Sequence, residues 1–440
     1  SKVVFESGNT EHIGSLHIPG TNTVVIAYMD KGNSNRLTAR VASVSGTTVT
    51  FPTAALVVYS SSMGGGAKPR LRWDSVNNAI LLVAYIGSVM RAFRLSISGT
   101  TLTVVDSLNF NSASGATKYG MEFLTGAGKF LITFLSTSNG LQAFTADCSG
   151  SGISFSSNST INGNTNFDHL DSCYDETNDV MVLYHIRTSD YKPRVYIFNA
   201  SGSSYGNQGD VILSNTNSER LEHASCVFDT ANNKVVIMGT RYDSHVSGYV
   251  LDFNSSISSP TIGSVQSSST GRSLYAMAAY DSTEQKIGVV YLNFTASGLR
   301  YLEATVNASN NTLTFSSVDT LVDDSTENYS WQPLAYVPAQ QTFVGAFVDG
   351  DNSNYGTAVS IQSARNTTNS ASYIGISNGA YADGATATIQ TVGSVDDAQS
   401  GLTIGSTHYV QPDGSLSTTA GSPSVEAGTA VSATKLIVKG

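Results

Sequence analysis

Apolar and polar positions along the chain follow a strand-and-turn pattern that recurs. The clearest copy is WDSVNNAILLVAY (73–85), in which an aromatic residue precedes a polar turn, an apolar strand and a second aromatic residue. Close copies lie at 174–184, 228–239 and 280–291, and weaker ones at 17–28, 123–134 and 336–347. The copies start 50 to 56 residues apart. A period of this size indicates a solenoid, a propeller or an array.

Each repeat holds several strand signals. The second repeat contains PRLRWD (69–74), AILLVAYI (79–86), RAFRLSIS (91–98) and TLTVVDSLNF (101–110), separated by short polar connections. No long stretch has the apolar spacing of an amphipathic helix. Four-stranded antiparallel sheets repeated four to eight times are typical of a β-propeller. The sequence therefore predicts an all-β protein with a seven-bladed β-propeller over residues 1–365.

The ends of the repeat array predict how this ring closes. The seventh repeat supplies three strands, whereas the first residues, SKVVFESGN (1–9), resemble an outer strand. We expect the N-terminal strand to complete the last blade, which leaves only short protected edges. The aromatic residues that start the repeats are expected to pack between neighbouring blades, with the polar residues after them forming the turn. They are His17, Trp73, Phe123, Tyr174, Phe228, Tyr280 and Tyr336.

A second position of the repeat carries the candidate binding residues. Five residues before each starting aromatic, the side chain is never aliphatic. These residues are His12, Lys68, Lys118, His169, His223, Tyr275 and Trp331. In a propeller they would encircle one mouth of the central channel. Solvent exposure of the strand ends would explain the same residue types. A ligand surface is the functional alternative, because Trp and Tyr offer flat apolar faces and Lys and His offer hydrogen-bond donors, which suits a sugar.

Other residues extend this predicted ligand surface. Next to the ring positions stand Arg70, Asp168, Asp171, Arg220, Glu222, Arg272 and Tyr329. The loops between second and third strands are expected at the same face, and rigid scaffolds commonly carry binding loops. Those loops include 30–36, 187–194, 241–247 and 349–355.

Composition narrows the range of partners. The net charge is −10, the pI is about 5.1 and only 13% of residues are charged. An acidic chain with few basic residues is a poor partner for nucleic acid or an anionic membrane. No apolar run reaches about 18 residues, so no membrane insertion is expected. The three cysteines, Cys148, Cys173 and Cys226, have no disulfide or metal spacing, and we expect buried free thiols.

Catalytic and metal motifs are weak. Asp349, Asp351 and Ser353 alternate as in a calcium loop, but the acidic twelfth residue is missing, and turn chemistry explains them equally well. A zinc site is not expected, because His12 lies three blades from the other ring histidines. A glycosidase would need paired carboxylates, for which Asp168 or Asp171 with Glu222 is the best pair, and Glu122 is a further candidate. We expect a protein without a catalytic site or cofactor, and leave a glycan-degrading enzyme open.

Residues 366–440 differ from the repeats. Short strand signals alternate with turns, and Pro412-Asp413-Gly414 is a hairpin signal. The stretches SGLTIGSTHYVQPDGSLSTT (400–419) and AGTAVSATKLIVKG (427–440) resemble the C-terminal module of tailed-bacteriophage virion proteins, common in fibres and appendages of marine and cyanobacterial phages. His408 stands where that module often has Tyr. The resemblance covers about a sixth of the chain and implies a small β-rich module on the particle surface, often in multimeric fibres.

Together these features predict a non-catalytic phage virion surface protein, such as a tail fibre or appendage, that binds a host receptor or glycan through the channel mouth. A capsid decoration or head-fibre protein and a glycan depolymerase are the alternatives. The expected partners are host-surface glycan and other virion proteins, with a homo-oligomer left open. The first residues lack the apolar core of a signal peptide, which agrees with assembly in the host cytoplasm.

Overall fold

The computed structural model describes residues 2–64, 68–111, 118–201, 204–242, 245–254, 256–269, 271–293, 298–322, 333–362, 373–379, 381, 386–411, 414–420 and 424–439. The chain divides into two compact units, Ser1–Ser363 and Ala364–Gly440. The described secondary structure is strand with four short 3-10 turns, so the protein is all-β.

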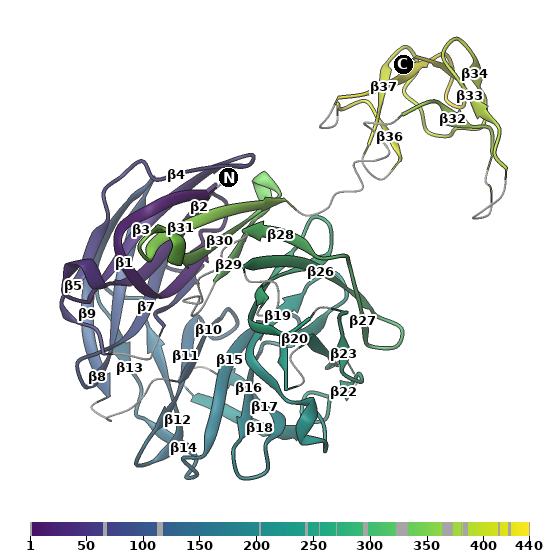
Figure 1. The fold of residues 1–440 in the computed structure, drawn as a ribbon. Helices are drawn as coiled ribbons and strands as arrows, with labels where there is room; N and C mark the ends of the chain where they lie inside the picture. Colours follow the sequence, from purple (N-terminus) through teal and green to yellow (C-terminus); the bar gives the residue numbers. More distant parts are fainter. Residues whose placement is uncertain are drawn as a thin grey trace. The chain divides into compact units, whose positions relative to one another are not determined.

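The first unit consists of antiparallel sheets in which the chain passes from a first strand to a second, a third and one or two outer strands (Figure 1). The first strands are β1 (Lys2–His17), β6 (Arg70–Asp74), β10 (Tyr119–Leu124), β15 (Phe167–Asp175), β19 (Leu221–Asp229), β24 (Ser273–Asp281) and β29 (Leu334–Val337). The second strands are β2 (Thr23–Asp30), β7 (Ala79–Ile86), β11 (Lys129–Ser136), β16 (Val180–Arg187), β20 (Lys234–Arg241), β25 (Lys286–Asn293) and β30 (Thr342–Asp349).

The third and outer strands complete each sheet. The third strands are β3 (Arg36–Ser45), β8 (Val89–Ser98), β12 (Gly140–Asp147), β17 (Lys192–Ser201), β21 (Val246–Asp252), β26 (Leu299–Asn307) and β31 (Tyr355–Gln362). The outer strands are β4 (Thr48–Thr50), β5 (Leu56–Ser62), β9 (Thr101–Asn111), β13 (Ser154–Phe155), β14 (Ser159–Asn162), β18 (Ser204–Ile212), β22 (Thr261–Ile262), β23 (Gln266–Ser267), β27 (Thr312–Phe315) and β28 (Asp319–Val322). The 3-10 turns are η1 (Lys31–Asn33), η2 (Asn217–Glu219), η3 (Pro338–Gln340) and η4 (Gly350–Asn352).

Strand β1 belongs to two sheets. Its first half pairs with β31, with Lys2 opposite Val359, and its second half pairs with β2, with Leu16 opposite Val25. The N-terminal residues therefore supply the outer strand of the sheet that begins with β29. The first strands also contact one another in a cycle, from β1 through β6, β10, β15, β19 and β24 to β29 and back to β1. This cycle gives the first unit a propeller-like arrangement.

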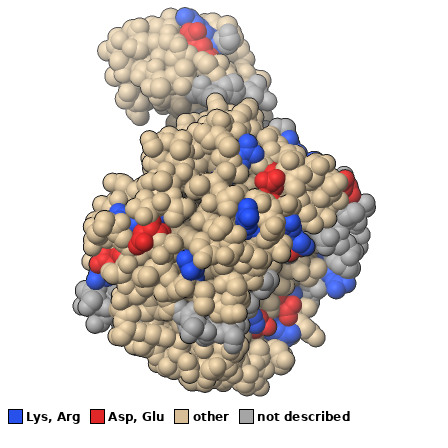
Figure 2. All heavy atoms as spheres, turned by 90° about the vertical axis from the view of Figure 1, so that its left-hand side faces the viewer, with Lys and Arg blue, Asp and Glu red and all other residues tan. Residues whose placement is uncertain are grey.

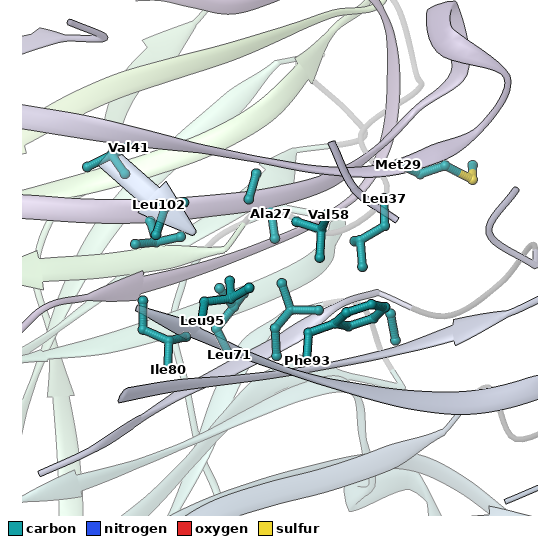
Figure 3. Packing of buried hydrophobic residues seen from close by; sticks show 14 of the residues in the cluster. Ala27, Met29, Leu37, Val41, Val58, Leu71, Ile80, Phe93, Leu95 and Leu102 are labelled. Carbon is teal, nitrogen blue, oxygen red and sulfur yellow. The ribbon is translucent and has the colours of Figure 1, made fainter. Parts of the chain in front are cut away.

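Apolar side chains between neighbouring sheets form the core. Strands β2 and β7 are buried along their whole length, because each lies inside a sheet that is covered on both faces. Ala27 and Leu37 of one sheet pack against Leu71 and Phe93 of the next (Figure 3). The same kind of cluster recurs between the following sheets.

The starting aromatics lie in these clusters, as predicted, with one exception. Trp73, Phe123, Tyr174, Phe228, Tyr280 and Tyr336 each pack between two sheets. His17 instead bonds within its own turn, where its Nε2 lies 2.9 Å from the carbonyl oxygen of Thr21. The imidazole is smaller and more polar than the other aromatics, so it bonds to a carbonyl of the turn and does not pack between the sheets.

The first hairpin turns are held by buried aspartates. Asp74, Asp175, Asp229 and Asp281 have no exposed surface. The carboxylate of each accepts backbone N–H groups two and three residues further on, at 2.8 to 3.1 Å. Such bonds replace the water that a buried turn loses. This explains the polar residue that follows the aromatic in these repeats.

The second unit is a small β module. Its strands are β32 (Ile376–Ser377), β33 (Ile389–Gln390), β34 (Val395–Asp396), β35 (Thr407–Val410), β36 (Leu416–Ser417), β37 (Glu426–Ala430) and β38 (Leu436–Val438). A core that includes Leu402, Val410, Ala427 and Leu436 lies among them. The predicted turn residues Pro412 and Asp413 lie outside the described part of the chain.

The surface carries few charges, and they are scattered over the face that Figure 2 shows. The three cysteines are free and buried, as predicted. Among the described residues there is no helix of the length and apolarity that crossing a membrane requires.

Candidate functional site at the mouth of the strand ring

The predicted ring residues lie where the first strands begin. Lys68 lies two residues before β6 and Lys118 directly precedes β10, whereas the other described members lie inside their strands. The end of each second strand pairs with the start of the first strand, as Phe167 does opposite Arg187 and Leu221 opposite Arg241. The loops from second to third strands therefore open at this same end, as expected. We call this end of the strand ring the mouth.

Four ring residues share an unusual backbone conformation. His12, His169, His223 and Tyr275 have φ between 50° and 55°, a left-handed region that non-glycine residues rarely adopt. The strand register shifts at each of them, which marks a β-bulge. Bulges redirect a side chain and gather near functional sites. The repeat thus places four side chains in the same way at the mouth.

Three of these side chains touch in a row. The ring centroids of His169 and His223 are 4.8 Å apart, and those of His223 and Tyr275 are 4.3 Å apart. The backbone N–H of His223 donates to Nδ1 of His169 at 3.1 Å. These residues come from the neighbouring strands β15, β19 and β24, so the bulges build a continuous aromatic surface at one side of the mouth.

Burial keeps the ring histidines neutral. It lowers the pKa of His223 to about 3, with a further contribution from the nearby His169. Burial also lowers the pKa of His12 and His169, although Glu11 and Asp168 oppose this effect. At neutral pH the mouth therefore offers neutral imidazoles, which both donate and accept hydrogen bonds.

The two lysines have different surroundings. Lys118 Nζ lies 2.7 Å from Asp168 Oδ1, and both side chains are 37% exposed. Lys68 lies deeper, with its Nζ 4.0 Å from the sulfur of Met277, which belongs to β24. Burial and the nearby Arg70 lower the pKa of Lys68 to about 7. Lys118 thus presents a charge at the surface, and Lys68 lines the channel.

The remaining predicted residues are distributed unevenly. His12 lies on β1, where its Nε2 is 3.9 Å from Glu11 Oε2. Arg272 is exposed. Trp331 and Tyr329 lie outside the described residues. The structure thus brings His169, His223 and Tyr275 together, with Lys118 joined to them through Asp168.

A cavity of about 180 Å³ lies below the mouth, lined by first strands of several sheets. Arg70 forms an ion pair with Asp171, and Arg72 binds Glu122 through two bonds of 2.7 Å. Burial would raise the pKa of Asp171, but Arg70 and Lys68 hold it below its usual value. The sequence did not reveal Arg72, although PRLRWD places two arginines on one face of a strand.

These pairs decide the roles of the candidate carboxylates. Asp171 and Glu122 are buried and each is bound to an arginine of β6, so Glu122 links the neighbouring strands β6 and β10, and Asp171 links β6 to β15. Asp168 and Glu222 are the carboxylates that the mouth exposes. Partial burial would raise the pKa of Asp168, but the Lys118 ammonium and the backbone N–H of His169, which donates to Oδ1 at 2.9 Å, hold it below its usual value.

The predicted calcium loop forms the turn η4. Asp349 Oδ2 lies 3.1 Å from Lys2 Nζ, and Ser353 adopts the left-handed conformation. The loop after β2 has the same backbone, and there Asp30 accepts the N–H of Asn33 at 3.0 Å. Among the described residues, no group of three or more His, Cys, Asp or Glu side chains is placed to hold a metal. A calcium ion at Asp349, Asp351 and Ser353 stays a prediction.

Comparisons with known proteins show similarity of fold. No family model matches the chain, and no curated protein matches it. A chain of the mitotic checkpoint complex matches with a TM-score of 0.51 and 8% identity, over 82% of this chain and 94% of that chain. The periplasmic gluconolactonase of Pseudomonas aeruginosa gives 0.48 and 8%, over 81% and 97%. The lectin SapL1, solved with alpha methyl fucoside, gives 0.42 and 14%, over 72% and 98%.

Proposed function

We propose that the first unit is a seven-bladed β-propeller that binds glycan at its mouth, and that the chain is a non-catalytic surface protein of a tailed phage. The contiguous surface of His169, His223 and Tyr275 carries the proposal. Three neighbouring strands adopt the same strained bulge to build it. Strain repeated in this way indicates a site that the fold holds in place.

The topology supports seven blades. Within the described residues, seven first strands contact one another in a cycle, and β1 joins the last sheet to the first. Each is followed by the strands of one antiparallel meander. Closing the ring with the N-terminal strand removes the exposed edges that would otherwise pair with other chains.

The chemistry of the mouth suits a sugar. A pyranose offers an apolar ring face and several hydroxyl groups. Tyr275 and the imidazoles supply flat faces, and His169, whose Nδ1 accepts the backbone N–H of His223, keeps its Nε2–H as a donor. Lys118 and Asp168 add a charged donor and acceptor at the edge. A neutral, polar and aromatic surface of this kind favours glycan over nucleic acid, which needs a basic surface.

A non-catalytic role agrees with the carboxylates. A glycosidase needs a carboxylic acid whose pKa is raised so that it can donate a proton. Here the pKa values of both Asp168 and Asp171 lie below the usual value, for the electrostatic reasons given above.

The phage assignment rests on the second unit. Its sequence resembles virion modules, and its described surface exposes Ile374, Val392, Val395, Ile404 and Val431. Exposed apolar side chains in so small a module favour contact with other virion proteins. The same observation supports the second candidate function, a capsid decoration or head fibre that this unit anchors.

Two measurements test the proposal. Antibody labelling of purified particles, read by electron microscopy, should place the chain at the distal tail; label over the capsid would favour decoration, and absence from particles would overturn the virion role. On an array of neutral and acidic oligosaccharides, the triple variant His169→Ala, Tyr275→Ala, Trp331→Ala should lose binding. The control is Val76→Ala, because Val76 is exposed and lies in the turn between β6 and β7, at the opposite end of the strands from the mouth. Unchanged binding by the triple variant would show that the mouth is not the site.

A further inference from the structure

Two exposed tyrosines enclose an arginine beside the mouth. The Cζ atom of Arg220 lies 4.0 Å from the ring centroid of Tyr242 and 5.0 Å from that of Tyr191. The tyrosines are 58% and 49% exposed, although large aromatic side chains are usually covered. We propose that Tyr191, Arg220 and Tyr242 form a second sugar-binding site, where the sheets that begin with β15 and β19 adjoin.

Hydrogen bonds and an ion pair fix the position of the Arg220 side chain. Its guanidinium donates to the carbonyl oxygen of Asn217 at 3.2 Å and contacts Glu222 Oε1 at 3.3 Å. The preceding turn η2 is fixed by the Tyr249 hydroxyl, which donates to the carbonyl of Glu219 at 2.8 Å. A side chain fixed in this way has little conformational entropy left to lose on binding.

The tyrosines are carried by loops of two sheets. Tyr191 ends the loop from β16 to β17, where its N–H donates to the carbonyl of Arg187 at 2.7 Å and its φ of 52° is left-handed. Tyr242 directly follows β20, in the loop to β21. Residue 220 lies in the connection between the two sheets. Three separate loops therefore converge on one guanidinium.

Stability gains little from this arrangement. A cation–π contact at an exposed site contributes about 0.5–1 kcal/mol. Two half-exposed tyrosines therefore add little to the fold, and one of them adopts an uncommon backbone conformation. Their exposed surface gives flat apolar faces on which a pyranose ring can stack.

The guanidinium supplies the polar part of the recognition. Arginine has five N–H donors in a fixed planar arrangement. Nη1 donates to Asn217 and Nε to Glu222, and Nη2 lies 3.3 Å from the same Glu222 oxygen. The remaining donors suit a sugar hydroxyl or carboxylate. Glu222 is a partly exposed acceptor and is followed directly by His223 of the mouth. The second site therefore continues into the first, and the ligand class is an oligosaccharide rather than a single sugar.

This inference rests on the proposed glycan-binding role, but not on the mouth residues themselves. The test uses the full chain on the same oligosaccharide array, with dissociation constants of the bound oligosaccharides then measured by titration calorimetry. Tyr191→Ala and Tyr242→Ala should each weaken binding about tenfold, since an aromatic contact contributes roughly 1.4 kcal/mol. Arg220→Lys keeps the charge and loses the planar donors, and should also weaken binding.

Matched controls separate binding from folding. Tyr381→Ala removes an exposed tyrosine of the second unit, and Arg91→Lys changes an arginine that lies 4.2 Å from the Tyr59 ring in another sheet. Both should bind as the unchanged chain does. The tyrosine variants and Arg91→Lys should unfold at nearly the same temperature as the unchanged chain, because these side chains are exposed or lie in cation–π pairs of small energy. Arg220→Lys keeps the positive charge beside Glu222, and its unfolding temperature is measured alongside.

The outcomes are distinct for the two sites. One outcome is that the triple mouth variant loses binding while the Tyr191 and Tyr242 variants bind as the unchanged chain does. That outcome would overturn this inference and keep the proposed function. Binding that is about tenfold weaker in the Tyr191 and Tyr242 variants and weaker in Arg220→Lys, with Tyr381→Ala and Arg91→Lys unaffected, would support it. An unchanged chain that binds none of the oligosaccharides would overturn both.

Discussion

The two ends of the first strands follow opposite rules. At the turn end, four sheets use the same residue, an aspartate without exposed surface, to accept the same two backbone N–H groups. At the mouth end, four sheets use the same backbone conformation for different side chains, three histidines and a tyrosine. The fold therefore requires one residue type at the turn end, whereas at the mouth end it sets only the direction of the side chain.

Burial explains this difference. The turn N–H groups are covered by neighbouring sheets, so each needs an acceptor from the chain itself. At the mouth, Lys118 and Asp168 are each 37% exposed, so water can replace the partners of their polar atoms. These two side chains can therefore change with little cost to folding. Such a surface can acquire specificity while the scaffold stays the same.

The largest expected effect is the loss of stability when a buried ion pair of the channel is broken, compared with the loss of an exposed pair at the mouth. Arg70→Met should leave Asp171 charged, buried and without its main partner, and should lower the free energy of unfolding by about 4 kcal/mol. Lys118→Met removes a pair whose members are both 37% exposed, and should cost less than about 1 kcal/mol. Urea unfolding of both variants measures the difference. Equal losses would mean that the channel and the mouth are equally exposed to water.

The next comparison sets one aspartate against another. Asp229→Ala deprives two backbone N–H groups and the Asn232 amide of their acceptor, and should destabilise the first unit by about 3 kcal/mol. Asp168→Ala, at the mouth, should cost about 1 kcal/mol or less, because water replaces a half-exposed carboxylate. Hydrogen exchange of the 230–233 turn provides a local measurement. Similar protection in both variants would contradict the distinction.

The sequence predicts the turn end better than the mouth. The aspartates, the aromatics between sheets and the direction of the loops all follow from local pattern and period. The left-handed bulges cannot be predicted from the local pattern, because histidine and tyrosine do not indicate a positive φ as glycine does. The pairs Arg70–Asp171 and Arg72–Glu122 join strands far apart in the sequence, and Tyr191, Arg220 and Tyr242 meet from three loops. Such contacts depend on the closed ring.

The pH dependence of stability tests the burial of the mouth. The pKa of His223 is about 3 in the folded chain, against 6.5 without burial. Between these values the unfolded chain binds a proton that the folded chain does not, so His223 makes stability fall as the pH drops from 6.5 towards 3. At pH 5 the loss relative to pH 8 is about 2 kcal/mol. His223→Gln should remove this part of the slope.

The measurement is urea unfolding at several pH values, together with NMR titration of the imidazole. Lys118→Met, which changes a partly exposed residue of the mouth and leaves the histidines in place, is the control. An imidazole that titrates near pH 6.5 would show that the mouth is open to water. The row of ring contacts from His169 through His223 to Tyr275 would then not exclude water in solution.

The smallest effect concerns the hydrogen bonds that join sheets at the turn end. The Tyr336 hydroxyl donates to Thr283 Oγ1 of the preceding sheet at 2.9 Å, while its ring packs 4.9 Å from that of Phe343. Tyr336→Phe keeps the ring and removes the bond, so a loss of about 1 kcal/mol is expected. Thr283→Val should cost a similar amount, and the double variant should cost less than the sum, because both changes remove one shared bond. Strict additivity would show that the bond between sheets contributes nothing, and that aromatic packing alone holds neighbouring sheets together at this end.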